Sequence, residues 1–266
     1  MIDIHHHLLY GLDDGSPDIE TSLAMAEAAA ADGITHIVCT PHASSNFAYQ
    51  PELNQERLAA LRERLGDRIT LGIGCDFHLS YDNIEDALKN RTKYTINQKK
   101  YLLVEFNDFM IPQNITDVFY ELSIAGQQPI ITHPERNAVI KRNPERMKDW
   151  IREGALVQIT SSSLTGRFGK TAQALSFQFL EKNWVHFLAT DAHNLDSRPP
   201  KLSEGYEVLE KRFGKETAER LCVTNPRAVF YGEDFPRQPQ ALDIADEHSG
   251  QPLPKKGFFG RLFSRD

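Results

Sequence analysis

Histidines and carboxylates gather in the first stretch of the chain, MIDIHHHLLYGLDDG. If IDIH forms a strand, His5 and His7 point to one face and His6 points to the other, because side chains alternate along a strand. The histidines stand inside an apolar run, which argues against an expression tag. His5 and His7 are therefore candidate metal ligands.

The same residue types recur after most of the apolar, β-branched runs of the chain. A single histidine at a strand end is more often structural, and a single acidic residue in such a loop is usually a helix cap. Six strand ends that all carry these residues are better explained by one shared site. The candidates are His5, His7, His42, Asp76, His78, Glu105, His133, Glu135, Arg136, Asp191 and His193.

Nitrogen and carboxylate ligands without thiolates suit Mn, Fe, Zn or Mg. Asp191 and His193 repeat the two-residue spacing of His5 and His7. With about eight ligands at roughly three or four per ion, the site is expected to hold two or three divalent metal ions. The residues alone indicate metal-dependent hydrolysis of an anionic ester.

The sequence lacks the motifs of other catalytic mechanisms. A thiol phosphatase needs Cys-x5-Arg, but the positions six after the three cysteines hold Ser45, Tyr81 and Ala228. GxSxG, GxGxxG and GxxxxGK[ST] motifs are absent from the sequence. An amidohydrolase would share the HxH start but normally has a lysine at the end of its fourth strand, where this chain has Glu105.

Seven apolar runs are candidate strands, and amphipathic segments such as DIETSLAMAEAAAADG separate them. Apolar strands that alternate with helices predict a parallel sheet covered on both faces, and seven βα units favour a closed, TIM-like α/β barrel. The C-terminal ends of barrel strands converge on one face, where barrel enzymes build their sites. The runs are residues 2–5, 36–40, 69–74, 101–106, 129–132, 156–160 and 185–190.

The composition predicts one main domain at residues 1–235, since a chain of 266 residues with 40% hydrophobic content can bury one large core. Residues 236–266 are rich in Pro, Gln and charge and are expected to be a flexible tail. The tail ends in KKGFFGRLFSRD, for which weak contact with a membrane surface is an alternative to a disordered end. The disordered end is favoured because so short a helix is marginal by itself.

The net charge of -7 and the pI near 5.8 argue against a nucleic-acid-binding protein, which needs clustered Lys and Arg. The three cysteines are far apart and odd in number, which predicts no disulfide framework and a reducing, cytoplasmic setting. No signal peptide and no transmembrane run of 18 apolar residues is expected.

The ordered set HHHLLYGLDDG, TPH, VEF, THPER and TDAHNLDSRPP resembles the polymerase-and-histidinol-phosphatase (PHP) superfamily. Within it, the set is similar to the bacterial tyrosine-protein phosphatases of the capsule and exopolysaccharide type. The resemblance runs from residue 1 to about 232, where the chain reads VTNPRAVFYG. It implies a distorted seven-stranded (βα) barrel of the PHP fold with a trinuclear metal centre.

The resemblance also implies roles by position. Arg136 and Arg198 would bind the phosphate, and Asp14 and His42 would share in catalysis; Asp13 or His42 is a candidate proton donor. The family usually has a bridging Glu on its third strand, where this chain has Asp76, one methylene shorter. His78 is a candidate to compensate, with a plain loop residue as the alternative. The implied ligands are His5, His7, Asp14, His42, Asp76, Glu105, His133, Asp191 and His193.

The activity implied by the resemblance is metal-dependent hydrolysis of phosphotyrosine, with Mn as the expected ion. Hydroxide held by the metals would attack phosphorus, since coordination lowers the pKa of water from about 15.7 to about 7. The implied partner is the tail of a bacterial tyrosine kinase that controls capsule or exopolysaccharide production. The implied location is cytoplasmic, or peripheral to the inner face of the membrane.

Two alternatives stay open: a PHP phosphoesterase for a small molecule such as histidinol phosphate, and a non-catalytic metal-binding regulator. The sequence does not give the oligomeric state.

Overall fold

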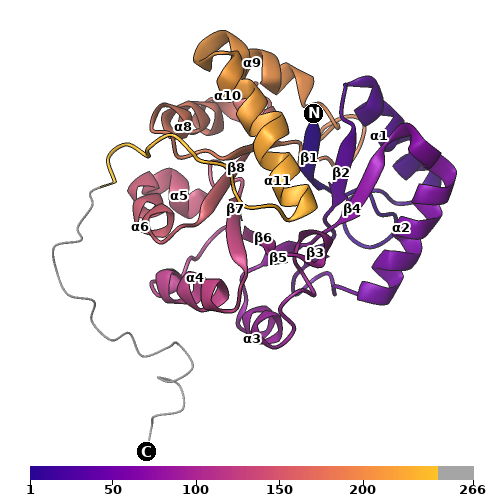
Figure 1. The fold of residues 1–266 in the computed structure, drawn as a ribbon, viewed down its shortest axis with the longest axis horizontal. Helices are drawn as coiled ribbons and strands as arrows, with labels where there is room; N and C mark the ends of the chain where they lie inside the picture. The colour runs from indigo at the N-terminus through magenta and orange to yellow at the C-terminus, as the bar shows by residue number, and fades with distance from the viewer. Residues whose placement is uncertain (245–266) are drawn as a thin grey trace, which may run out of the picture.

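The computed structural model describes residues 1–244 of the chain, in which parallel strands alternate with helices (Figure 1). One sheet has the strand order β1-β2-β4 and the other has the order β3-β5-β6-β7-β8-β9. All the pairings between these strands are parallel. The strands are β1 (Ile2–His6), β2 (His36–Cys39), β3 (His42–Ala43), β4 (Thr70–Ile73), β5 (Asp76–His78), β6 (Tyr101–Glu105), β7 (Gln128–Thr132), β8 (Leu156–Thr160) and β9 (Phe187–Ala189).

Each of the seven predicted runs contains a strand, and the parallel α/β fold is confirmed. Two further strands were not predicted: β3 follows β2 after a break at Thr40 and Pro41, and β5 follows β4 after a break at residues 74–75. A proline interrupts a ladder because it has no N–H to donate. Beyond the strands, the N–H of His7 donates to the carbonyl of Ala192 over 2.9 Å, which joins β1 to the segment after β9. The closed seven-stranded barrel stays a prediction.

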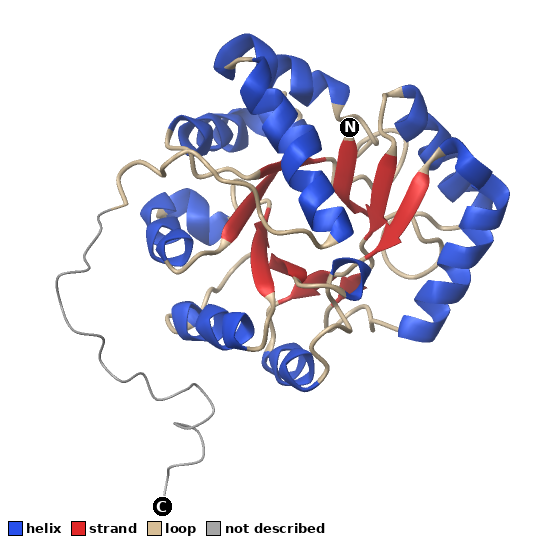
Figure 2. Cartoon of the chain, in the orientation of Figure 1, coloured by secondary structure: helices blue, strands red, loops and turns tan. Residues whose placement is uncertain are grey.

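Helices surround the strands on the outside (Figure 2). The first begins after Asp18, whose carboxylate accepts the N–H of Thr21 over 2.7 Å and so caps the helix. None of the helices in residues 1–244 is long and apolar enough to cross a membrane. The helices are α1 (Ile19–Ala31), α2 (Pro51–Leu65), α3 (Tyr81–Lys89), α4 (Ile115–Ile124), α5 (Ala138–Arg142), α6 (Met147–Arg152), α7 (Ser161–Leu164), α8 (Gly169–Glu181), α9 (Ser203–Phe213), α10 (Lys215–Glu219) and α11 (Asn225–Tyr231).

The buried apolar side chains form two clusters that lie on the two faces of the strands. The outer cluster packs strand residues such as Val104 and Ile131 against helix residues such as Phe119. The inner cluster joins Ile2 and Ile4 of β1 to alternate residues of the other strands, and α11 adds Val229 and Phe230 to it. Helix α11 thus covers one end of the strands (Figure 1), and their C-terminal ends carry the polar residues described below.

The predicted tail begins at residue 236, and its first residues lie against the domain. Leu242 donates its N–H to the carbonyl of Lys182 over 2.9 Å, and its own carbonyl accepts from the indole of Trp184 over 2.9 Å. Gln238 exchanges hydrogen bonds with the side chain of Asn225. The predicted amphipathic end, residues 255–266, lies outside the described residues.

Candidate metal centre

His5 lies on β1 and His7 directly follows it, and the pairing of this strand with β2 has an irregular register. Asp3 pairs with Ile37 and His6 with Cys39, so β1 uses three steps where β2 uses two. A bulge of this kind shifts the alternation of side chains by one residue. His5 and His7 lie on the same side, as predicted from their spacing, with their Nε2 atoms 3.3 Å apart, and the bulge determines which face of the strand that side is.

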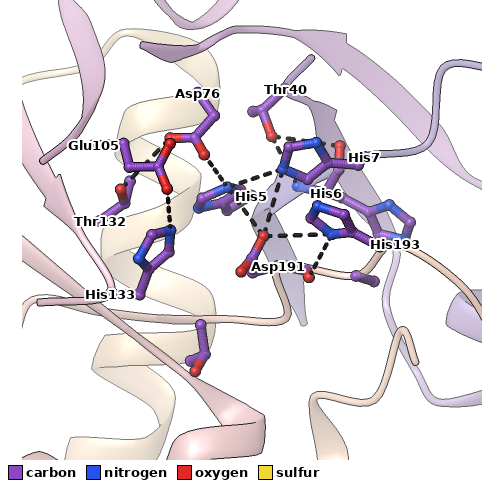
Figure 3. A network of polar contacts seen from close by, with 12 residues as sticks. His5, His6, His7, Thr40, Asp76, Glu105, Thr132, His133, Asp191 and His193 are labelled. Carbon is purple, nitrogen blue, oxygen red and sulfur yellow. Dashed lines mark hydrogen bonds and ion pairs between the residues drawn. The ribbon is translucent and has the colours of Figure 1, made fainter. Parts of the chain in front are cut away.

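Carboxylates from β5 and from the loop after β9 surround these two imidazoles (Figure 3). His5 Nε2 lies 3.3 Å from Asp76 Oδ2 and 3.4 Å from Asp191 Oδ1. His7 Nε2 also lies 3.4 Å from Asp191 Oδ1. All four residues are buried. Asp191 has a positive φ of 53°, an uncommon conformation for a residue other than glycine that often marks a functional site.

A second part of the cluster lies nearer to the surface. His42 Nε2 is 3.3 Å from Asp14 Oδ1, and His42 Nδ1 is 3.4 Å from Asp76 Oδ2 and 3.6 Å from Glu105 Oε2. His193 Nε2 lies 3.4 Å from the same oxygen of Asp14. Asp76 therefore connects the buried part of the cluster to the part that solvent can reach.

The donor atoms gather at the distances that metal sites need. In each of four groups, the ligand atoms lie within 4.8 Å of one another, and together the groups contain all nine predicted ligands. Several buried atoms of the cluster, among them Asp76 Oδ2, Asp191 Oδ1 and His193 Nε2, make no hydrogen bond although each lies within 3.4 Å of another candidate ligand atom. Divalent ions would satisfy such atoms, so the residues fit a metal centre. The groups are His7, Asp14, His42 and His193; His5, His7 and Asp76; His5, His133 and Asp191; and His42, Asp76 and Glu105.

The charges of the cluster are strongly coupled. Burial opposes protonation of His5, but Asp76 and Asp191 raise its pKa to about 9. Burial likewise opposes protonation of His42, while Asp14, Asp76 and Glu105 raise its pKa to about 10. A bound cation would take the place of these protons, because metal ligands must be deprotonated.

In three of the histidines, Nδ1 makes a hydrogen bond, so the other ring nitrogen, Nε2, is the one available to a metal. His5 Nδ1 lies 3.0 Å from Gln158 Oε1, His7 Nδ1 lies 2.8 Å from Asp13 Oδ2, and His193 Nδ1 lies 3.0 Å from the carbonyl of Asp191. These oxygens act as acceptors, so each Nδ1 carries a proton, and each Nε2 can offer a lone pair to a metal once it is deprotonated. Partners of this kind fix the ring orientation of metal-bound histidines.

The structure assigns different surroundings to the adjacent aspartates. Asp14 lies within one of the ligand groups, whereas Asp13 does not. Asp13 is largely enclosed and accepts hydrogen bonds from His7, from the N–H of Gly15 and from the N–H of His42. Burial raises the pKa of Asp13, but His7 and these hydrogen bonds outweigh it and lower the pKa to about 2. This supports Asp14 as the ligand of the pair.

The predicted phosphate-binding arginines both reach the cluster. Arg136 and Arg198 form ion pairs with Asp191 Oδ2, and about a quarter or less of each side chain is exposed, at 25% and 22%. Arg136 also lies over the ring of Phe168, 4.5 Å from its centroid. Both guanidinium groups therefore stand at the edge of the candidate ligands.

Other predicted candidates lie beside the cluster. His78 pairs in register with Glu105, and its Nδ1 is 3.7 Å from Glu105 Oε2; it ends β5, a separate short strand, because β4 stops at Ile73. Glu135 is buried and accepts from the N–H and hydroxyl of Thr160, both over 3.0 Å, so it ties the HPER loop to β8. Gln158 was not predicted at all. Its only signal in the sequence is a polar residue in the middle of the apolar run LVQIT.

A cleft of about 400 Å³ opens beside the surface part of the cluster. Its polar side contains Asp14, His42, His78 and Glu105, and the rest of its lining comes from two loops, residues 44–47 and 106–109. Most of the loop residues are exposed.

Comparisons with known proteins place the chain in one family. The family model CpsB/CapC, described as capsular polysaccharide synthesis, matches residues 1–231. Tyrosine-protein phosphatase YwqE of Bacillus subtilis is 36% identical over 264 residues, covering 98% of this chain and 99% of the relative. The putative tyrosine-protein phosphatase CapC of Staphylococcus aureus is 35% identical over 242 residues, covering 85% and 92%.

Solved structures are similar to this chain as well. One comes from work on YwqE of Bacillus subtilis and CpsB of Streptococcus pneumoniae, described as unique metal-dependent tyrosine phosphatases. It matches with a TM-score of 0.84 and 37% identity, covering 91% of this chain and 99% of that one. A β-aspartyl dipeptidase from Fervidobacterium islandicum matches with a TM-score of 0.50 and 13% identity, over 94% of this chain and 78% of that one, a likeness in fold alone.

Proposed function

The chain belongs to the CpsB/CapC capsular polysaccharide synthesis family and is a metal-dependent tyrosine-protein phosphatase, and we propose that it hydrolyses phosphotyrosine at the cluster described above. The observation that carries the choice of site is the convergence of nine His and carboxylate ligands beside two arginines. The nine proposed metal ligands are His5, His7, Asp14, His42, Asp76, Glu105, His133, Asp191 and His193.

Divalent ions at this cluster, for which we propose manganese in two or three positions, would lower the pKa of water to about 7 and offset the phosphate charge. Arg136 and Arg198 would bind the phosphoryl oxygens, because a guanidinium can donate two parallel N–H groups to an anionic group. Their present partner, Asp191 Oδ2, is itself an anionic oxygen. A phenolate leaving group has a pKa of about 10, so it needs less help from an acid than an alkoxide would.

For the biological substrate, we propose the phosphotyrosine tail of a bacterial tyrosine kinase that acts in capsule or exopolysaccharide production. The family description, capsular polysaccharide synthesis, supports this choice. The exposed walls of the cleft support a protein substrate over a small molecule such as histidinol phosphate, which would favour a deep pocket. We also propose that the two sheets close into one distorted seven-stranded barrel at residues 1–235.

The test is hydrolysis of a phosphotyrosine peptide with manganese or with EDTA present. We expect EDTA to abolish turnover, His133→Ala to lower kcat/KM at least about 100-fold, and Arg198→Ala to lower it by roughly 10- to 100-fold. Arg212→Ala is a matched control, since Arg212 pairs with Glu181 on the outer surface. Turnover that survives EDTA, or hydrolysis of histidinol phosphate with none of the peptide, would contradict the proposal.

A further inference from the structure

Two aromatic side chains stand on the walls of the cleft, next to the proposed metal ligands. Phe47 and Phe109 both line the cleft, whereas Phe106, the third phenylalanine of the lining, is buried against Phe119 and Trp150. We call Phe47 and Phe109 the aromatic walls. Since the polar side of the same cleft is made by candidate metal ligands, any group between the aromatic walls lies beside the phosphate position.

Phe47 is held parallel to a proposed metal ligand. Its ring stacks on His42 with a centroid distance of 5.8 Å and an interplanar angle of 14°. The turn that carries it is fixed, because the N–H of Ser44 donates to the carbonyl of Phe47 over 2.9 Å and Ser44 Oγ accepts the N–H of Phe47 over 3.3 Å. Phe47 thus extends the metal cluster with a flat apolar surface.

Phe109 is exposed although its loop is anchored. Of its surface, 89% is accessible, and the adjacent Met110 is 67% exposed. Asn107 Oδ1 accepts the N–H groups of both residues, over 2.9 and 3.2 Å, and the carbonyl of Asn107 accepts from Asn137 over 3.0 Å. Exposed apolar side chains that cluster at a polar cleft are typical of a ligand-binding surface.

The sheet order places the two walls on different sides of one strand. Phe47 follows β3 and Phe109 follows β6, while β5 lies between these strands and ends at His78 in the cleft. A planar ring that enters above His78 therefore has an apolar surface available from each flanking loop. Aromatic rings in contact favour binding beyond the effect of the buried area.

On the basis of the proposed function, we propose that Phe47 and Phe109 bind the phenyl ring of the phosphotyrosine and make the enzyme prefer aryl over alkyl phosphates. A phosphoserine presents the same phosphate without a ring, so it gains nothing from the walls. Neither phenylalanine carries a group that can ligate a metal or bond to phosphate. Their contribution is to substrate binding and selectivity.

The test compares two peptides of one sequence that carry phosphotyrosine or phosphoserine, with inorganic phosphate as a competitive inhibitor. We expect Phe109→Ala and Phe47→Leu each to raise KM for the phosphotyrosine peptide about 2- to 10-fold. The inhibition constant of phosphate and the slower turnover of phosphoserine should not change. Ile124→Ala, which truncates a side chain that is 63% exposed at the end of α4, is the matched control.

The outcomes separate this inference from the proposed function. If the wild-type protein hydrolyses the phosphotyrosine peptide while both wall variants behave like Ile124→Ala, the ring contact is overturned and the phosphatase assignment stands. Equal losses on both peptides would also overturn it, because they indicate a general disturbance of the site. If the wild-type protein hydrolyses neither peptide, the proposed function fails and the inference fails with it.

Discussion

At the scale of single residues, the type of a side chain does not by itself determine its role, even for two adjacent residues. Asp13 and Asp14 are the same amino acid in adjacent positions, yet Asp13 bonds to His7 and to two backbone N–H groups, whereas Asp14 faces His42 and His193. The side chain of Asp14 is 51% exposed and that of Asp13 is 1% exposed. One aspartate orients a proposed ligand and the other is a proposed ligand.

This difference predicts distinct effects of two matched substitutions. Asp13→Asn places an amide NH2 against N–H donors, so we expect a lower melting temperature in EDTA and roughly 10-fold weaker metal binding. Asp14→Asn should leave the melting temperature in EDTA unchanged and lower the bound metal per chain. Differential scanning fluorimetry and metal analysis after dialysis measure both effects. Identical behaviour of the two variants would contradict the assignment.

At the scale of elements, the bulge in β1 decides which histidines face the site. Ile2 and Ile4 lie on the inner face, so strict alternation would have placed His6 there and turned His5 and His7 outward. The extra residue between Asp3 and His6 reverses this order. His6 is left buried with neither ring nitrogen hydrogen-bonded among the described residues.

Strand β8 contributes none of the proposed ligands but holds two of them. The side chain of Gln158 meets His5 Nδ1, and its carbonyl accepts the N–H of His133 over 2.8 Å. His133 has a positive φ of 33°, so its uncommon backbone conformation depends on such contacts. The strand positions ligands that come from β1 and from the loop after β7.

We therefore expect Gln158→Leu to weaken manganese binding about 10- to 100-fold, because His5 loses the acceptor that orients its ring. Gln158→Glu keeps an acceptor and should restore most of the affinity. Gln127→Leu is the matched control, since Gln127 is also buried but bonds to the carbonyls of Ala87 and Arg91. Titration calorimetry gives the affinities; wild-type affinity in Gln158→Leu would show that the contact does not matter.

At the scale of the whole molecule, the two ends of the strands differ in the side chains that they carry. Helix α11 covers one end with apolar side chains, and the opposite end carries every proposed ligand. The segment that follows α11 then returns across the outside of the domain and bonds near Trp184. We therefore expect the stability of the domain to depend on residues beyond the predicted boundary at 235.

A truncation series tests this point. A chain that ends at residue 235 loses six hydrogen bonds that Gln238, Gln240 and Leu242 make to the domain, so we expect its free energy of unfolding to fall by about 3–6 kcal/mol at roughly 0.5–1 kcal/mol per bond. The reference is a chain that ends at Ile244, which keeps these bonds. Urea unfolding of both gives the difference. Equal stability would show that residues 236–244 do not brace the domain.

The sequence by itself determined the kinds and order of the proposed ligands and the alternation of strands with helices. These features depend on residue chemistry and on short-range periodicity, which can be read along a chain. The tertiary structure decided the bulge in β1, the separate surroundings of Asp13 and Asp14, and the role of Gln158. Gln158 and His5 are 153 positions apart, so their contact depends on strand register and on how the sheets come together. No local pattern encodes such a contact, because the partner is supplied by a distant part of the chain.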